Sequence, residues 1–256
     1  MPVRARMQRV VSRSAVVLIL AFAATACARL AAVDSNALWK IVSLRCVPSQ
    51  QATGTSGQCT SVDLDKRYAI LKDIVGRSQH LLIPTDRITG IESPLILEPH
   101  AQPYWADAWA SRVYVEKAVK RSLPDSQLSL EINSAFRRSQ NQLHIHIDCL
   151  RGDVSETLSQ HANDSPGQWR WDTLDGNRYR IMRVTSLTQQ NDPFQIVARD
   201  NKDADAMAMQ TILVTGAGTS AEKDGWLIVN SGLNLDNGSG SAEGLQDHKC
   251  RVAEAN

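Results

Sequence analysis

The stretch that decides the fold is Ser139-Gln140-Asn141-Gln142-Leu143-His144-Ile145-His146-Ile147-Asp148-Cys149, whose second part alternates polar and apolar residues. A period of two is typical of a β-strand with one buried face, so we expect a strand over 142–149. Alternate side chains of a strand share a face. The polar face then carries Gln142, His144, His146 and Asp148, and the apolar face Leu143, Ile145, Ile147 and Cys149.

The two histidines are the candidate catalytic residues, His146 and His144. On one pleated face their rings are expected to lie roughly 6–7 Å apart, close enough to bracket one phosphate. A metal site would need further ligands, and His80, His100, His161 and His248 show no ligand spacing to the pair. We therefore expect no metal and no cofactor. From these residues alone, two histidines on a solvated strand face remain an alternative to catalysis.

A polar, partly cationic loop over 133–140 leads directly into this strand. Guanidinium, amide and hydroxyl groups beside an imidazole suit an anionic phosphoryl transition state. A solvated basic hairpin turn is the alternative. The candidate substrate-binding residues are Asn133, Arg138, Ser139, Gln140 and Gln142.

Outside this region, the sequence predicts a single α+β domain with an antiparallel sheet. Further strands are expected over 68–71, 80–83, 128–132, 179–184, 211–215 and 226–229. Helices are expected over 37–44 with Ser35 as N-cap, over 104–119 as one amphipathic helix, and over 154–161. Trp105 and Trp109 of the second helix are interpreted as core residues, and no lipid-binding groove is assigned.

Residues 1–33 are interpreted as an export or anchor segment and 34–256 as the globular domain. Arginines at the N-terminus precede the apolar run Ala15–Ala28, which at about 14 residues is shorter than the ~20 needed to span a bilayer. A cleaved signal, a lipoprotein signal acylated at Cys27 and an uncleaved anchor reaching Val33 remain open. All three place the remaining chain outside the cytoplasm. We expect membrane association through this segment at the cell inner membrane, with the domain on the periplasmic side.

Cysteine usage agrees with export. Removing Cys27 with the leader leaves an even number, and Cys46 and Cys59 flank a Gly/Ser/Thr-rich loop as natural partners. Cys149 and Cys250 would then form the second bond, with four free thiols as the alternative. The formal net charge of +1 indicates no general attraction to nucleic acid. The sequence does not indicate an oligomeric state.

The histidine strand resembles the histidine-triad pattern His-φ-His-φ-His-φ-φ, with Asp148 in place of the last histidine. A second register begins at Gln142 and puts His144 in the middle; we favour the first, which puts His146 there. The chain is more closely similar to the CDP-diacylglycerol pyrophosphatases. That resemblance covers Trp39, the Cys46/Cys59 pair, Leu81–Ile88, Gly90, Glu92–Pro94, Ile132–Ser134, Arg138–Gln140, the histidine strand and Gln246–Cys250.

The resemblance implies a histidine-triad-like fold and an enzyme that hydrolyses the diphosphate of CDP-diacylglycerol to CMP and phosphatidate. The middle histidine would attack phosphorus and carry the nucleotide as a covalent intermediate. Asp148 would repel a phosphate unless protonated, so hydrogen bonds to the phosphate would have to come from other residues. For His248 we favour a structural role. Alternatives are hydrolysis of a soluble dinucleotide or CDP-linked compound, and a non-catalytic periplasmic binding protein.

Overall fold

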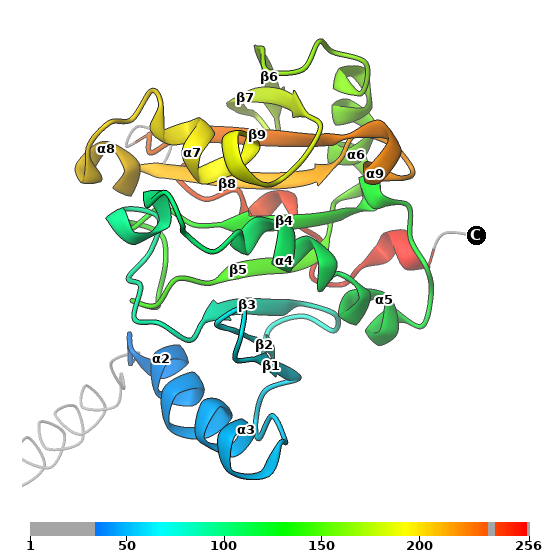
Figure 1. The fold of residues 1–256 in the computed structure, drawn as a ribbon. Coiled ribbons are helices and arrows are strands. Elements are labelled where there is room, and N and C mark those ends of the chain that lie inside the picture. The colour runs from blue at the N-terminus through cyan, green and yellow to red at the C-terminus, as the bar shows by residue number, and fades with distance from the viewer. Residues whose placement is uncertain (1–33, 235–238, 255–256) are drawn as a thin grey trace, which may run out of the picture. The chain divides into compact units, whose positions relative to one another are not determined.

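A nine-stranded antiparallel sheet forms the centre of the domain in the computed structural model, which describes residues 34–234 and 239–254 (Figure 1). The strand order is β1-β2-β3-β5-β4-β8-β9-β7-β6. The predicted α+β class with an antiparallel sheet is thereby confirmed. The predictions for residues 1–33 lie outside the described residues. No helix in the described part of the chain combines the length and apolar character that crossing a bilayer requires.

The strands include all six that were predicted outside the histidine segment. Their bounds are β1 Ser61–Asp63, β2 Tyr68–Lys72, β3 His80–Pro84, β4 Leu128–Ile132, β5 Ile145–Cys149, β6 Trp169–Leu174, β7 Asn177–Val184, β8 Gln210–Gly216 and β9 Trp226–Gly232. The helices are α2 Ala37–Ile41, α3 Val47–Thr53, α4 Tyr104–Ala110, α5 Val113–Val119, α6 Gly152–Leu158, α7 Pro193–Ala198, α8 Ala204–Ala208 and α9 Ala221–Asp224.

One face of the sheet is apolar along most of its width and is covered by α4, α5 and α7 (Figure 1). The apolar side of the histidine strand lies here, as the alternation predicted. Trp105 and Trp109 are buried in the same core, which confirms their interpretation as core residues. Residues from this face include Leu82, Leu130, Ile132, Ile145, Ile147, Cys149, Ile212, Val214 and Ile228.

The opposite face carries two separate apolar clusters. The first packs the helical segment 37–53 on Ala69, Leu81 and Ile83. The second joins α6 to β7, β8 and β9 around Leu213 and Val229. Between them, β5 and β4 present buried polar side chains, because their apolar residues already face the other core. This polar strip consists of Glu131, His144, His146, Asp148 and Ser129.

The segment 37–53 is one helical stretch longer than the predicted helix over 37–44. A π-helical turn, Val42–Cys46, joins α2 to α3, and Cys46 on it bonds Cys59, with a Cα–Cα distance of 5.6 Å. The prediction of Ser35 as N-cap is wrong: Asn36 occupies that position and makes no side-chain cap bond. The Asn36 side chain instead accepts a hydrogen bond from Arg87, which ties the start of the helix to the loop after β3.

Two other predicted elements have different bounds. The expected helix over 104–119 is two helices separated by a turn at Ser111–Arg112, where the amides of Arg112 and Tyr114 donate to carbonyls three residues back. The histidine strand begins at Ile145 rather than at Gln142. Gln142 is withdrawn from the sheet, and its side-chain amide donates to the carbonyls of Pro84 and Asp86.

Candidate active site

The two histidines open together into one pocket of about 340 Å³ on the polar strip. Their ring centroids are 5.0 Å apart and the rings are tilted by 49°. This separation is shorter than the strand rise predicted, because His144 precedes the first residue of β5. The pocket is lined by Ala37, Leu38, Ile41, Leu71, Lys72, Asp73, Ile74, Val75, Leu81, Asn133, Arg137, Ser139, Gln140, His144, His146 and Glu243.

Hydrogen bonds give His144 a defined tautomer. Its Nδ1 lies 2.7 Å from the carbonyl oxygen of Gln142, which accepts only, so Nδ1 carries the proton. The lone pair of the neutral ring is therefore on Nε2. The residue that the strand pattern grouped with the histidines, Gln142, thus contributes its backbone to the site and uses its side chain elsewhere.

His146 has the opposite tautomer. The Gln79 side-chain nitrogen donates to the Asp73 carboxylate at 2.7 Å, which fixes the orientation of this amide. The same nitrogen lies 2.9 Å from His146 Nδ1 and donates to it, so Nδ1 holds the lone pair. The proton of the neutral ring is then on Nε2, a buried atom without a hydrogen-bond partner among the described residues. The pair therefore presents one acceptor nitrogen and one donor nitrogen.

Burial keeps both rings uncharged at neutral pH. Desolvation and, to a smaller extent, the neighbouring His146 ring lower the pKa of His144 to about 4. Desolvation also lowers the pKa of His146 to about 4, in the same direction as the effect of His248. A neutral imidazole retains the lone pair that a nucleophile needs, and a neutral donor does not repel it.

Two carboxylates border the pair and were not found from the sequence. Glu131 lies directly opposite His146 on β4 and is fully buried; its Oε1 accepts from the Thr211 hydroxyl and the Ala242 amide. Glu243 lies 3.7 Å from His146 Nδ1, and the Asn133 amide donates to it at 3.0 Å. Burial, together with the charge of Glu243, raises the pKa of Glu131 well above its ordinary value.

Glu131, His146 and Glu243 have potential ligand atoms within 4.8 Å of one another. A divalent cation at this point would have three protein ligands, one of them a carboxyl group whose burial opposes the ionised form that binds metal. We therefore assign no metal to this cluster.

The predicted substrate-binding residues divide into three groups. Asn133, Ser139 and Gln140 line the pocket beside the histidines, while Gln142 contributes only its backbone. Arg138 does not line it: its guanidinium forms two hydrogen bonds with the Glu92 carboxylate and lies against Gly90, where any Cβ would clash with it. The neighbouring Arg137 is exposed and lines the pocket in its place.

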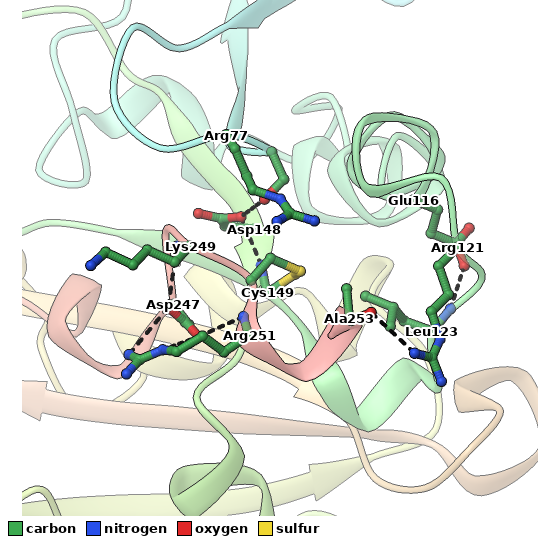
Figure 2. The surroundings of a disulfide bond; sticks show 12 residues. Arg77, Glu116, Arg121, Leu123, Asp148, Cys149, Asp247, Lys249, Arg251 and Ala253 are labelled. Atoms are coloured by element: carbon green, nitrogen blue, oxygen red, sulfur yellow. Dashed lines mark hydrogen bonds and ion pairs between the residues drawn. A yellow bond between two sulfur atoms is a disulfide. The ribbon is translucent and has the colours of Figure 1, made fainter. Parts of the chain in front are cut away.

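His248 lies at the edge of this site, in the segment that Cys250 holds. The second disulfide joins Cys149 to Cys250 with a Cα–Cα distance of 5.2 Å. Figure 2 shows Asp148 beside this bond and Asp247 binding Lys249 and Arg251 on either side of Cys250. His248 Nδ1 is 2.9 Å from Asp148, and this contact raises the pKa of His248.

Asp148 is therefore directed away from an incoming phosphate. Its buried carboxylate accepts from the Ser78 hydroxyl at 2.7 Å and from the Cys149 amide, in addition to His248. The Nε2 atom of His248 lies 3.6 Å from Glu243, which also borders His146. His248 thus has a structural partner and a position adjacent to the histidine pair.

Replacing Glu131 by glutamine should change how stability depends on pH. Because the pKa of Glu131 is raised in the folded state, the native protein loses stability as pH rises from the unfolded pKa toward the folded one. The substituted glutamine cannot ionise and keeps an oxygen for Thr211 and Ala242. In urea titrations, the variant should gain unfolding free energy relative to native protein between about pH 5 and pH 8, by on the order of 1 kcal/mol.

The matched control is Glu222→Gln, at an exposed carboxylate on α9. This control should show the same change in unfolding free energy between pH 5 and pH 8 as the native protein. A Glu131→Gln variant that loses unfolding free energy relative to native protein as pH rises toward 8 would contradict the raised pKa of Glu131.

The α+β sheet holds two neutral histidines of opposite tautomer in one pocket, and comparisons with known proteins give the class of the protein, a hydrolase. The model of the CDP-diacylglycerol pyrophosphatase family matches residues 33–254. A CDP-diacylglycerol pyrophosphatase of Yersinia pestis is 36% identical over 223 residues, which cover 86% of this chain and 85% of the relative. The chain belongs to the CDP-diacylglycerol pyrophosphatase family.

Proposed function

We propose that the enzyme hydrolyses the diphosphate of CDP-diacylglycerol to CMP and phosphatidate, with His144 as the nucleophile. The substrate rests on the family match and on the name of the relative. The observation that carries the choice of nucleophile is the hydrogen bond from His144 Nδ1 to the Gln142 carbonyl, which leaves the Nε2 lone pair available at the pocket. This choice corresponds to the second register of the triad pattern, beginning at Gln142.

In the first step, His144 Nε2 attacks the phosphorus that carries cytidine. The new N–P bond forms as the bond from that phosphorus to the bridging oxygen breaks, and phosphatidate departs. His146 donates a hydrogen bond to the leaving oxygen, because its neutral ring carries hydrogen on Nε2, and phosphatidate leaves as an anion without taking that proton. Arg137, Ser139 and Asn133, which line the same pocket, stabilise charge on the phosphoryl oxygens.

In the second step, water attacks the same phosphorus and the N–P bond breaks. CMP leaves, and His144 recovers its lone pair. The proton of the attacking water leaves to solvent from the phosphate product, and His146 keeps its Nε2 proton as a hydrogen-bond donor. Dividing one displacement into two lets the same nitrogen serve first as nucleophile and then as leaving group. Gln79 is a positioning residue, since its bond to Asp73 sets the tautomer of His146.

The fold is proposed to be histidine-triad-like, on the basis of the motif and the antiparallel sheet that presents it. We further propose that residues 1–33 attach the domain to the periplasmic side of the inner membrane. The basic leader and apolar run support this location, and the two disulfides are compatible with an oxidising compartment. A tether to the bilayer suits a lipid substrate.

Purified protein should convert CDP-diacylglycerol in mixed micelles to CMP and phosphatidate, with turnover retained in a chelator such as EDTA. Nucleotide and lipid products are separated by chromatography and identified by mass. CDP-choline serves as the soluble comparison and should be a poorer substrate by kcat/KM. Release of cytidine diphosphate instead of CMP, or preference for the soluble compound, would contradict the proposal.

A further inference from the structure

We propose that the apolar side of the histidine pocket is the diacylglycerol subsite, with Ile74 as its bilayer-facing lip. The subsite would hold the glycerol backbone and the first methylenes of the acyl chains. This inference rests on the proposed function, because it assumes that the diphosphate of the same lipid lies at the histidines. Its residues are Leu38, Ile41, Leu71, Ile74, Val75 and Leu81.

The pocket lining divides by chemistry and by structural element. Most polar groups come from the loop over 133–140, from the histidine pair and from Glu243, while Lys72 and Asp73 add two charged groups at the end of β2. Apolar groups come from α2, from the end of β2 with the following turn, and from β3. A substrate with a charged diphosphate and an aliphatic body matches this division, whereas a soluble dinucleotide offers no aliphatic group to the second set.

The volume of the pocket argues that the acyl chains continue beyond the protein. About 340 Å³ lies near the lower end of the range for small-molecule sites. A nucleoside diphosphate and two complete acyl chains exceed that volume, so the distal part of each chain has to leave past the rim. In the bilayer, this part can stay among neighbouring lipids, and the enzyme need not extract the whole substrate.

The rim residue Ile74 is fully exposed, and the adjacent Val75 is about half exposed. Two consecutive branched aliphatic side chains in solvent at the mouth of an apolar pocket are typical of a surface that meets a lipid or a partner. Transfer of this apolar area from water into hydrocarbon is favourable. The exposure is therefore accounted for by contact with the bilayer from which the substrate enters.

The turn that carries Ile74 is held firmly and is linked to His146. Asp73 at its start accepts from Gln79, which also donates to His146. Gly76, with φ of +67°, approaches the His248 carbonyl so closely that a Cβ would lie 2.8 Å from it, and the Arg77 amide donates to the same carbonyl. Ile74 is thus a fixed lip rather than a loose loop tip.

Chain length is compatible with this position. The apolar run ends at Ala28, and Ala37 already lines the pocket. The eight residues between them give nine Cα–Cα steps, which span at most about 32 Å when fully extended. If the run is held at the membrane as proposed, the pocket rim stays within reach of the bilayer surface.

The test is a change in substrate selectivity. In Ile74→Ser, the ratio of kcat/KM for dioleoyl CDP-diacylglycerol in mixed micelles to that for CDP-choline should fall about tenfold, because the lip loses apolar area. The control Leu95→Ser, at an exposed leucine outside the pocket, should keep the native ratio. An unchanged ratio in Ile74→Ser, or an equal fall in Leu95→Ser, would overturn the subsite.

A second measurement separates this inference from the proposed chemistry. His144→Ala protein is mixed with CDP-diacylglycerol that carries a photoreactive group near the glycerol end of one acyl chain, and the labelled peptides are identified by mass spectrometry. Label on residues 71–81 or 37–41 supports the subsite, and label concentrated elsewhere rejects it. If native protein hydrolyses no CDP-diacylglycerol, the proposed function fails, and the labelling pattern still decides the subsite.

Discussion

His144→Ala should lower kcat for CDP-diacylglycerol by at least ~10⁴-fold, the scale on which removal of a covalent nucleophile acts. The expected size follows from the tautomer: Nε2 of His144 holds the lone pair that attacks phosphorus, and the pocket contains no equivalent nitrogen among the described residues once His146 Nδ1 is engaged by Gln79. The measurement is CMP release by purified variant, with circular dichroism and thermal unfolding to verify the fold.

Two matched variants accompany it. His146→Ala removes a hydrogen bond to the leaving oxygen and should cost less, ~10²–10³-fold. His80→Ala should be nearly native in turnover, because His80 lies on β3 against Tyr114, whereas the histidine pair faces the opposite side of the sheet. If His146→Ala loses all activity while His144→Ala retains it, the first register of the triad pattern is correct and the proposed roles must be exchanged.

Replacing both Cys149 and Cys250 by serine should lower the free energy of unfolding by about 4.7 kcal/mol on the chain-entropy model. The bond closes a loop of sequence separation 101 and holds the C-terminal segment against β5. Turnover should fall as well, because His248 would lose its fixed position on the buried Asp148 carboxylate. The free energy of unfolding is measured by urea titration under oxidising conditions, and the activity is measured as CMP release.

The comparison variant is Cys46→Ser with Cys59→Ser, which opens a loop of sequence separation 13. Its expected loss is about 3 kcal/mol, smaller because the cost of closing a chain grows with loop length. Equal stability of the Cys149/Cys250 variant and native protein would contradict the proposed role of this bond. So would free thiols that titrate in unfolded but unreduced native protein.

Much of the fold follows from local patterns. The strands β2 and β3 and the strands β4 and β8 are short apolar or alternating runs bounded by turn residues, and these are the signals that a sequence shows most clearly. β6 was not predicted, because it is a sheet edge with mostly exposed or half-exposed side chains and lacks a clear apolar face. The break at Ser111–Arg112 also escaped prediction, because the apolar spacing continues through it to Val113 and Val115.

Only the part of the site that comes from one continuous stretch of sequence could be predicted. Both histidines and the loop residues that line the pocket with them come from one continuous stretch. Glu131, Gln79 and Glu243 come from distant segments that the strand order brings beside β5, and no short motif marks them. The sequence gives one signal for Glu131. It is a carboxylate in an alternating strand, on the polar face opposite Leu130 and Ile132.

The exchange of Arg138 for Arg137 at the pocket has the same origin. Adjacent arginines are equivalent in a polar loop until a partner selects one. Here Glu92, from the loop after β3, binds Arg138 through both carboxylate oxygens and leaves Arg137 at the pocket rim. Similarly, the choice between the triad registers depends on a backbone carbonyl and a distant glutamine, neither of which a strand pattern displays.

The most direct measurement is the identity of the residue that carries nucleotide during turnover. Enzyme mixed with CDP-diacylglycerol is quenched in alkali within milliseconds, since phosphohistidine bonds survive alkali better than acid, and peptides are mapped by mass spectrometry. We predict a cytidylyl group on His144. The same group on His146, or no adduct at any time while CMP accumulates, would contradict the proposed mechanism.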